Sequence, residues 1–263
     1  MWDSELLREV FRKYKDYINQ YGWSSYTLMN LNLLEPLLRE LRKIKLQNMI
    51  DFGCGYKVLS CIIAEYLNIN EVYGVDINEE RLNVEVPCKI NNIVTDITKP
   101  FSHLIGKSFD LVTSFGVIEH LQDWDIFMEN VIGLSHKGSL LLISAPNLGS
   151  WINRISLLMG FQPRDLEISS KRLYGVPPLY KGHTPAGHIK IATLRAMKQF
   201  IESYGFQVIR VFPLYAKDNV LANIVDSLLK PFPSLARRYV ILVQYAREKP
   251  MLSSLARKVL IPQ

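Results

Sequence analysis

The chain has 263 residues, 48% of them hydrophobic and 21% charged, and a formal net charge of +6. This is the composition of a globular protein long enough to bury a sizeable core, and the mild basic charge requires no particular partner. No apolar run approaches the roughly 20 residues of a membrane span, and the first residues lack the order of a signal peptide. We therefore expect no transmembrane segment and a cytoplasmic location.

The three cysteines point the same way. Cys54, Cys61 and Cys88 are an odd number and lack the close spacing of metal ligands. We expect all three to be reduced thiols of a cytoplasmic protein.

Two amphipathic helices precede the first predicted strand. Apolar residues recur at helical spacing over residues 4–18, and a second helix is expected to begin near Pro36, because proline is tolerated in a first turn. Together they predict an N-terminal helical layer. Such a layer either packs on the sheet or covers a substrate as a cap, and the aromatic residues between the helices suit both.

The most informative turn follows the first strand. Residues 48–57 read as a strand that reaches Asp51, a tight turn with Gly53, Cys54 and Gly55, and the start of a helix. Glycines in such a turn let a ligand approach the backbone, and the helix adds unpaired N–H groups. The third glycine of the dinucleotide fingerprint is absent, because Val58 stands in its place.

Two further predicted strands also end in carboxylates. Asp76 ends the strand after the first helix, and Asp96 ends the next strand. Open α/β sheets bind ligands at the carboxyl ends of their strands, and a carboxylate there can accept hydrogen bonds from both hydroxyls of a ribose. We assign that role to Asp76; a simple helix cap is the alternative.

The segment 109–121 is the most specific signal. Its Phe-Asp-Leu-Val opening and Glu-His-Leu closing, with the acidic-x-Gly-x-Gly turn at Asp51, resemble class I S-adenosylmethionine-dependent methyltransferases of the small-molecule type found in ubiquinone and menaquinone biosynthesis. The family often has another glycine where this chain has Lys57. The resemblance implies S-adenosylmethionine as cofactor, with Asp96 on the adenine amino group. It implies that the following residues bind the cofactor: Asp51, Gly53, Cys54, Gly55, Asp76, Ile77, Asp96, Ile97 and Phe115.

Catalytic candidates lie just after the fourth strand. His120 could act as a general base near the methyl group, with Glu119 orienting it, or it could be a packing residue. Some relatives carry Glu-x-x-Glu-His, which binds a divalent metal, but Gly116 replaces the first glutamate here. We therefore assign no metal ligands, and leave open whether His183 and His188 of the following loop supply missing ones.

The resemblance predicts one α/β domain. Its sheet would be doubly wound, mostly parallel and seven-stranded, with the last strand antiparallel beside the fifth. The segment 147–192, after the fifth strand, is too long to be a simple connection. Loops of such length are more often functional than idle, so we interpret this one as a substrate lid. The expected parts are an N-terminal helical cap over 1–46, a cofactor-binding half over 47–146, a lid insertion over 147–192, the rest of the sheet over 193–246 and a tail over 247–263.

The predicted function is methyl transfer to a small-molecule acceptor, with oxygen as the expected acceptor atom. The alternatives are an RNA or protein methyltransferase, an NAD-dependent oxidoreductase and a catalytically inactive cofactor-binding protein. Lysine and arginine are scattered, so we do not expect nucleic acid as partner. The helix predicted over 218–230, with Arg237 and Arg238 nearby, packs on the sheet edge or touches a membrane or lipophilic substrate. The sequence predicts no oligomeric state.

Overall fold

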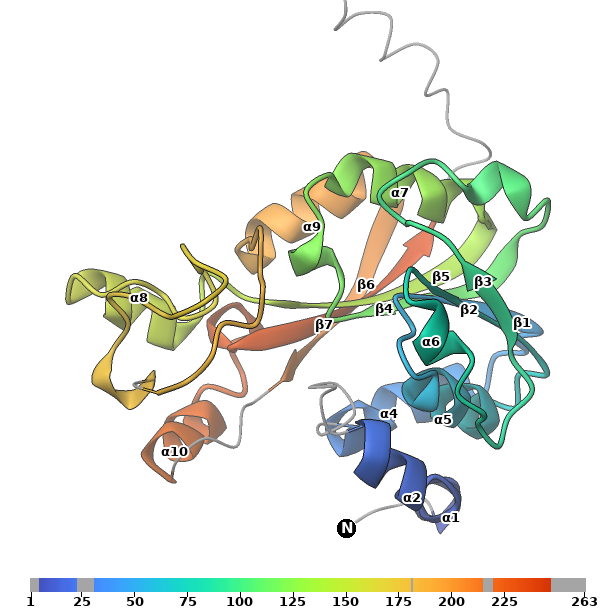
Figure 1. Ribbon diagram of the computed structural model, residues 1–263, viewed down its shortest axis with the longest axis horizontal. Coiled ribbons are helices and arrows are strands. Elements are labelled where there is room, and N and C mark those ends of the chain that lie inside the picture. The colour runs from blue at the N-terminus through green and yellow to red at the C-terminus, as the bar shows by residue number, and fades with distance from the viewer. Residues whose placement is uncertain (1–4, 23–30, 181, 215–219, 247–263) are drawn as a thin grey trace, which may run out of the picture.

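The computed structural model describes residues 5–22, 31–180, 182–214 and 220–246. Within these ranges a central sheet is covered by helices on both faces (Figure 1). The strands are β1 Asn48–Phe52, β2 Glu71–Asp76, β3 Asn91–Val94, β4 Phe109–Phe115, β5 Ser135–Pro146, β6 Phe206–Leu214 and β7 Arg238–Tyr245. The α-helices are α1 Glu5–Lys13, α2 Lys15–Tyr17, α4 Leu31–Leu41, α5 Val58–Leu67, α6 Glu79–Leu82, α7 Trp124–Gly133, α8 Trp151–Leu158, α9 Leu194–Ser203 and α10 Val220–Leu228. Shorter helical turns are η1 Ile18–Gly22, η2 Ser102–Leu104, η3 Ile118–His120, η4 Pro178–Tyr180 and η5 Pro233–Leu235.

The sheet has the strand order β3-β2-β1-β4-β5-β7-β6. Strands β1 to β5 pair in parallel, and β7 runs antiparallel between β5 and β6. The predicted doubly wound, seven-stranded, mostly parallel sheet is confirmed. Strand order reverses at β1, since β2 and β4 lie on its two sides. In open α/β sheets, ligands bind at the carboxyl ends of the strands beside such a switch point.

Alternating side chains of the strands enter two buried layers. Met49 of β1 packs with α5 and the N-terminal helices, whereas Ile50 and Phe52 pack with α7 and α9. Figure 1 shows the same division, with α7 and α9 above the sheet and α4 and α5 below it. Because both faces are covered, the central strands are continuous apolar runs.

The N-terminal helices form the predicted layer and pack on α5. Tyr14 is fully buried, and its hydroxyl donates to Glu65 of α5 at 2.9 Å. Tyr21 also stacks on Tyr56 in the turn after β1, with ring centroids 4.7 Å apart. The layer therefore both packs on the domain and reaches the predicted ligand-binding turn.

Two sequence expectations are wrong. Pro36 lies inside α4 and does not begin it, because the apolar face continues upstream to Leu34, which is 1% exposed. Cys61 and Cys88 form a disulfide with a Cα–Cα distance of 5.7 Å, so they are not free thiols. The fold brings α5 and the segment before β3 together across 27 residues, which spacing in the sequence does not reveal. Cys54 is a free cysteine.

The helices α8 and α10 lie on the side of the sheet where β5 ends and β7 begins (Figure 1). Asp226 of α10 accepts a hydrogen bond from the indole of Trp151 at 2.8 Å and lies 2.9 Å from the guanidinium of Arg237. The described part of α10 is thus linked to α8 and to the residue before β7, whereas its apolar residues Ile224 and Leu228 are 54% and 72% exposed. Residues 218, 219 and the predicted tail 247–263 lie outside the described residues. Among the helices that are described, none has both the length and the apolar character needed to cross a membrane.

Candidate functional site

The turn after β1 adopts an unusual backbone. Gly53, Gly55 and Lys57 all have positive φ, at 72°, 53° and 64°. A Cβ built on Gly53 would lie 2.4 Å from Cγ2 of Val117, so this position requires glycine. Lys57 takes the left-handed conformation that a glycine would adopt more easily, and its buried ammonium group donates to the carbonyl of Leu82.

Asp76 holds this turn in place. Its carboxylate accepts hydrogen bonds from the backbone N–H of Gly55 at 2.8 Å and of Asn78 at 2.9 Å. A carboxylate has about four acceptor positions, so it keeps capacity for further donors. The neighbouring Ile77 is 69% exposed, which places free apolar surface beside the carboxylate.

Asp51 lies beneath the turn. Its carboxylate accepts hydrogen bonds from the hydroxyls of Ser60 and Thr113, the latter at 2.6 Å. The parallel register sets Thr113 directly beside Asp51, and Ser60 comes from the first turn of α5. Burial raises the pKa of Asp51 to about 6, although both hydroxyl hydrogen bonds act to lower it.

The remaining predicted cofactor residues differ in what they offer. Burial raises the pKa of the Cys54 thiol, and its sulfur packs over Gly74, so this residue offers mainly its backbone. Asp96 accepts from the backbone and hydroxyl of Thr98, and these hydrogen bonds hold its pKa below the usual range. Ile97 packs into the layer under α7 and is 8% exposed. Phe115 ends β4 and is partly buried against the other layer.

The turn η3 after β4 is fastened to the segment 187–190. The carbonyl of Glu119 accepts from the backbone N–H of Ile189 at 2.8 Å and of Lys190 at 3.2 Å. Nδ1 of His120 lies 2.9 Å from the carbonyl oxygen of Gly187. A carbonyl can only accept, so Nδ1 carries a proton in this contact, and in the neutral ring the lone pair is on Nε2.

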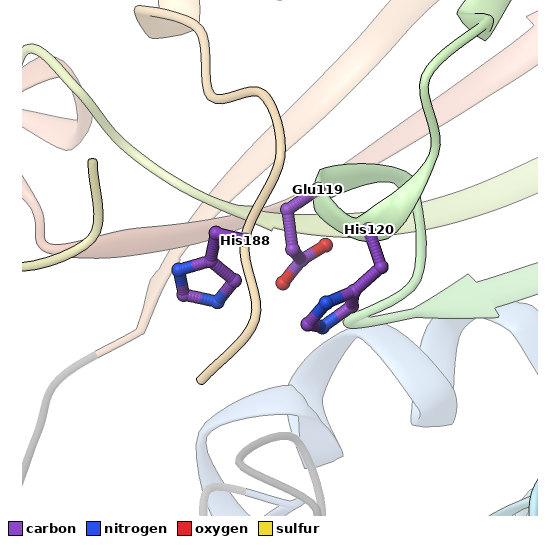
Figure 2. Close-up of side chains that lie close together, drawn as sticks. All are labelled: Glu119, His120 and His188. Atoms are coloured by element: carbon purple, nitrogen blue, oxygen red, sulfur yellow. The ribbon is translucent and has the colours of Figure 1, made fainter. Parts of the chain in front are cut away.

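The carboxylate of Glu119 is 1% exposed and does not orient His120 through a hydrogen bond. One oxygen, Oε1, forms an ion pair with Arg238 at the start of β7. The other oxygen, Oε2, has no hydrogen-bond partner among the residues that the structure describes. Figure 2 shows the carboxylate pointing into the space between the imidazole rings of His120 and His188.

His188 completes this group from the predicted lid. Its ring centroid is 5.1 Å from that of His120, and its Nδ1 is 3.2 Å from the carbonyl oxygen of Asp165. Burial lowers the pKa of His188, and its Nδ1 also lies 3.5 Å from Oε1 of the buried Glu167. His183 lies elsewhere, in contact with Tyr180. Sequence reasoning missed Arg238, which is 119 residues from Glu119 and carries no local motif.

A nucleoside-containing cofactor fits the arrangement around the turn. A Cβ on Gly55 would meet no atom within 4 Å among the described residues, so the backbone there faces open space. This space adjoins the Asp76 carboxylate and the exposed side chain of Ile77. The Asp76 carboxylate could accept from hydroxyl groups of a ligand, Ile77 could contact an apolar ring, and the space at Gly55 could admit a ligand close to the backbone.

Comparison with protein families gives one match that covers most of the chain. The model of a methyltransferase domain matches residues 11–211. A solved S-adenosylmethionine-dependent methyltransferase from Clostridium acetobutylicum is similar with a TM-score of 0.53 at 13% identity. That similarity covers 82% of this chain and 90% of the other, and it shows the shared fold.

Among the curated proteins that are similar over shorter stretches are two methyltransferases with different acceptors in their names. A release factor glutamine methyltransferase from Fusobacterium nucleatum is 30% identical over 87 residues, 31% of this chain and 25% of that protein. A ubiquinone biosynthesis O-methyltransferase from Coxiella burnetii is 24% identical over 156 residues, 53% of this chain and 62% of that protein. The chain therefore spans less than two thirds of the length of both relatives.

Proposed function

Because this chain belongs to the methyltransferase-domain family, we propose that it transfers the methyl group of S-adenosylmethionine to a hydroxyl oxygen of a small molecule. The observation that carries the proposal is the meeting of two features at one edge of the sheet. The glycine turn held by Asp76 and the turn with His120 are in contact, since Val117 packs directly against Gly53. Cofactor and acceptor would therefore be held side by side.

The cofactor half of the site follows from the chain's own groups. Asp76 would accept hydrogen bonds from the ribose hydroxyls, and the backbone at Gly53 and Gly55 would approach the methionyl part. Asp51 would act on the ammonium group through water or backbone, since both its oxygens already bind hydroxyls. Ile77 offers the exposed apolar surface for the adenine ring, with Asp96 as acceptor for its amino group.

S-adenosylmethionine brings a methyl group already activated by its sulfonium. The protein's main task is to align the acceptor oxygen with the methyl carbon and the sulfur, and such positioning is worth roughly 7–11 kcal/mol. The acceptor oxygen forms the new O–C bond while the C–S bond breaks and leaves its electron pair on sulfur. The hydroxyl proton moves to Nε2 of His120, whose lone pair is kept available by the contact of Nδ1 with Gly187.

Similarity to the ubiquinone biosynthesis O-methyltransferase supports oxygen of a small molecule as the acceptor. The segment 147–192 would serve as the lid, because Ile189 and Lys190 fasten it to Glu119 beside His120. The similarity to a release factor glutamine methyltransferase covers less of the chain. It makes a protein the second acceptor class that has to be tested.

The test measures transfer of labelled methyl from S-adenosylmethionine to four acceptor classes: phenolic and catecholic compounds, small amines, RNA and a release factor. We expect product with the hydroxyl compounds. His120→Ala should lower turnover about 10²-fold or more, the usual contribution of a general base, and leave the affinity for S-adenosylhomocysteine within about twofold. Transfer to RNA or protein alone would refute the acceptor class, and lost cofactor affinity would make His120 a structural residue.

A further inference from the structure

Three side chains meet where β4, the lid and β7 come together. Glu119, His120 and His188 each offer one possible ligand atom, and these atoms lie within 4.8 Å of one another. Figure 2 shows the three side chains directed at a common space, two from η3 and one from the lid. The proton transfer proposed above uses one of the three, so the other two call for an explanation.

Each of the two imidazoles has its Nδ1 against a backbone carbonyl oxygen. Nδ1 of His120 contacts the carbonyl oxygen of Gly187 at 2.9 Å, and Nδ1 of His188 contacts that of Asp165 at 3.2 Å. In each case the N–H donates to the carbonyl, and the lone pair stays on Nε2. Histidines that bind metals are usually held in this way by their second nitrogen.

Glu119 supplies the independent observation. Its side chain is 99% buried, and Oε2 has no hydrogen-bond partner within the described parts of the chain. A buried carboxylate oxygen without a partner is unfavourable, because it has lost its hydration and no hydrogen bond within the protein replaces it. A cation placed between the carboxylate and the two rings would bind this oxygen. Arg238 is paired with Oε1 and leaves Oε2 as the carboxylate oxygen without a partner among the described residues.

We propose that Glu119, His120 and His188 bind one divalent cation of the borderline class, such as Zn²⁺, Co²⁺ or Fe²⁺. Two imidazoles and one carboxylate form a ligand set that suits these ions and leaves positions open for further ligands. Mg²⁺ and Ca²⁺ prefer sites made of oxygens, and this set has one protein oxygen on offer. The incomplete Glu-x-x-Glu-His segment is thus completed from the lid by His188, not from Gly116.

The cation would also join the lid to the reaction centre. With it bound, the lone pair of His120 would be engaged; the cation would make a bound hydroxyl more acidic, and its proton would leave to solvent water in place of His120. This last step rests on the proposed function, because it needs a hydroxyl acceptor. Cation binding itself does not depend on that function.

The test uses the full-length protein without an affinity tag, freed of metals by chelation and then titrated with Co²⁺, followed by visible absorption, and with Zn²⁺, followed by calorimetry. We expect one equivalent of either ion to bind, and Mg²⁺ to bind at least about 100-fold more weakly. Glu119→Gln and His188→Ala should each weaken Zn²⁺ binding at least about tenfold, as losing one ligand should. His183→Ala is the matched control from the same lid and should bind like the parent protein.

Three results would overturn the inference: binding of no more than a small fraction of an equivalent, undiminished binding by Glu119→Gln and His188→Ala, or an equal loss in His183→Ala. Thermal melts verify that each variant is folded, and the two ligand variants lie on different elements, so that one remains informative if the other unfolds. Titration with S-adenosylhomocysteine separates the two proposals. A protein that binds it but no metal disproves only the cation site.

Discussion

At the residue scale, Asp51 is the most costly group of the site. Burial raises its pKa to about 6 from an ordinary value of 3.8. Between about pH 4 and pH 6 the folded protein therefore holds a proton on Asp51 that the unfolded chain has released. Stability is therefore highest below pH 4 for this group and falls as the pH rises from about 4 to 6. At about 1.4 kcal/mol per pKa unit, the loss is on the order of 3 kcal/mol.

We predict that Asp51→Asn removes this loss. The amide keeps hydrogen bonds with the hydroxyls of Ser60 and Thr113 but carries no charge. Urea unfolding at pH 7.5 should show the variant more stable by about 2–3 kcal/mol, and the difference should shrink toward pH 4. The S-adenosylhomocysteine affinity should fall. A variant that is less stable than the parent at pH 7.5 would show that the hydroxyl contacts outweigh the burial of charge.

Sequence reasoning identified the strand-end carboxylates but not every orientation. The residues just after a strand no longer alternate between faces, so Ile77 and Ile97 were indistinguishable in the sequence, although one is exposed and the other buried. Arg238 could not be predicted, because its partner Glu119 lies far away in the chain. His188 could be predicted only as one of two lid histidines, and the backbone contacts at Gly187 and Ile189 decide between them.

At the element scale, the glycine turn depends on its contact with the turn after β4. Gly53→Ala would press a Cβ against Val117 and force a left-handed alanine, whereas Gly55→Ala meets only the backbone strain. We predict losses of about 2–4 kcal/mol at Gly53 and about 1 kcal/mol at Gly55, measured by urea unfolding. Adding Val117→Ala to Gly53→Ala should restore part of the stability. No restoration would mean that the strain lies in the backbone alone.

The helices show where local patterns suffice. Nearly all side chains of α5 are buried, on the side of the sheet and on the side of α1 and α4, which agrees with its apolar sequence. The N-caps of α7 and α9, Asp123 and Thr193, accept hydrogen bonds from backbone N–H groups of their own helices, which is what these residue types do at helix starts. For α4, packing of Leu34 outweighs the preference of Pro36 for a first turn.

At the scale of the whole molecule, the disulfide ties α5 to the segment that leads into β3. We predict that Cys88→Ser destabilises the protein by about 3 kcal/mol under oxidising conditions, the typical effect of a loop of this size, which spans 27 residues. Cys54→Ser is the control, since Cys54 is free. Thiol titration of the unfolded, unreduced protein should find one thiol per chain. Three thiols would contradict the disulfide.

The overall fold was the best predicted feature. Asp51, Asp76 and Asp96 occur at successive strand ends, and this regular βαβ spacing predicts a parallel sheet whose strands end at one edge. The resemblance supplied the antiparallel last strand, which the structure confirms. The disulfide and the union of η3, the lid and β7 depend on contacts between distant segments, which no local pattern encodes. The domain boundaries and the lid role of 147–192 stay predictions.

The most direct measurement is calorimetric titration of the protein with S-adenosylhomocysteine and, separately, with NAD. We expect a one-to-one complex with S-adenosylhomocysteine and none with NAD. Asp76→Asn should weaken it about 10- to 100-fold, because hydrogen bonds to a charged acceptor are worth about 1.5–3 kcal/mol. Asp110→Asn, at the opposite end of β4, should leave it unchanged. Tight binding of NAD, or an S-adenosylhomocysteine affinity that Asp76→Asn does not alter, would contradict the account.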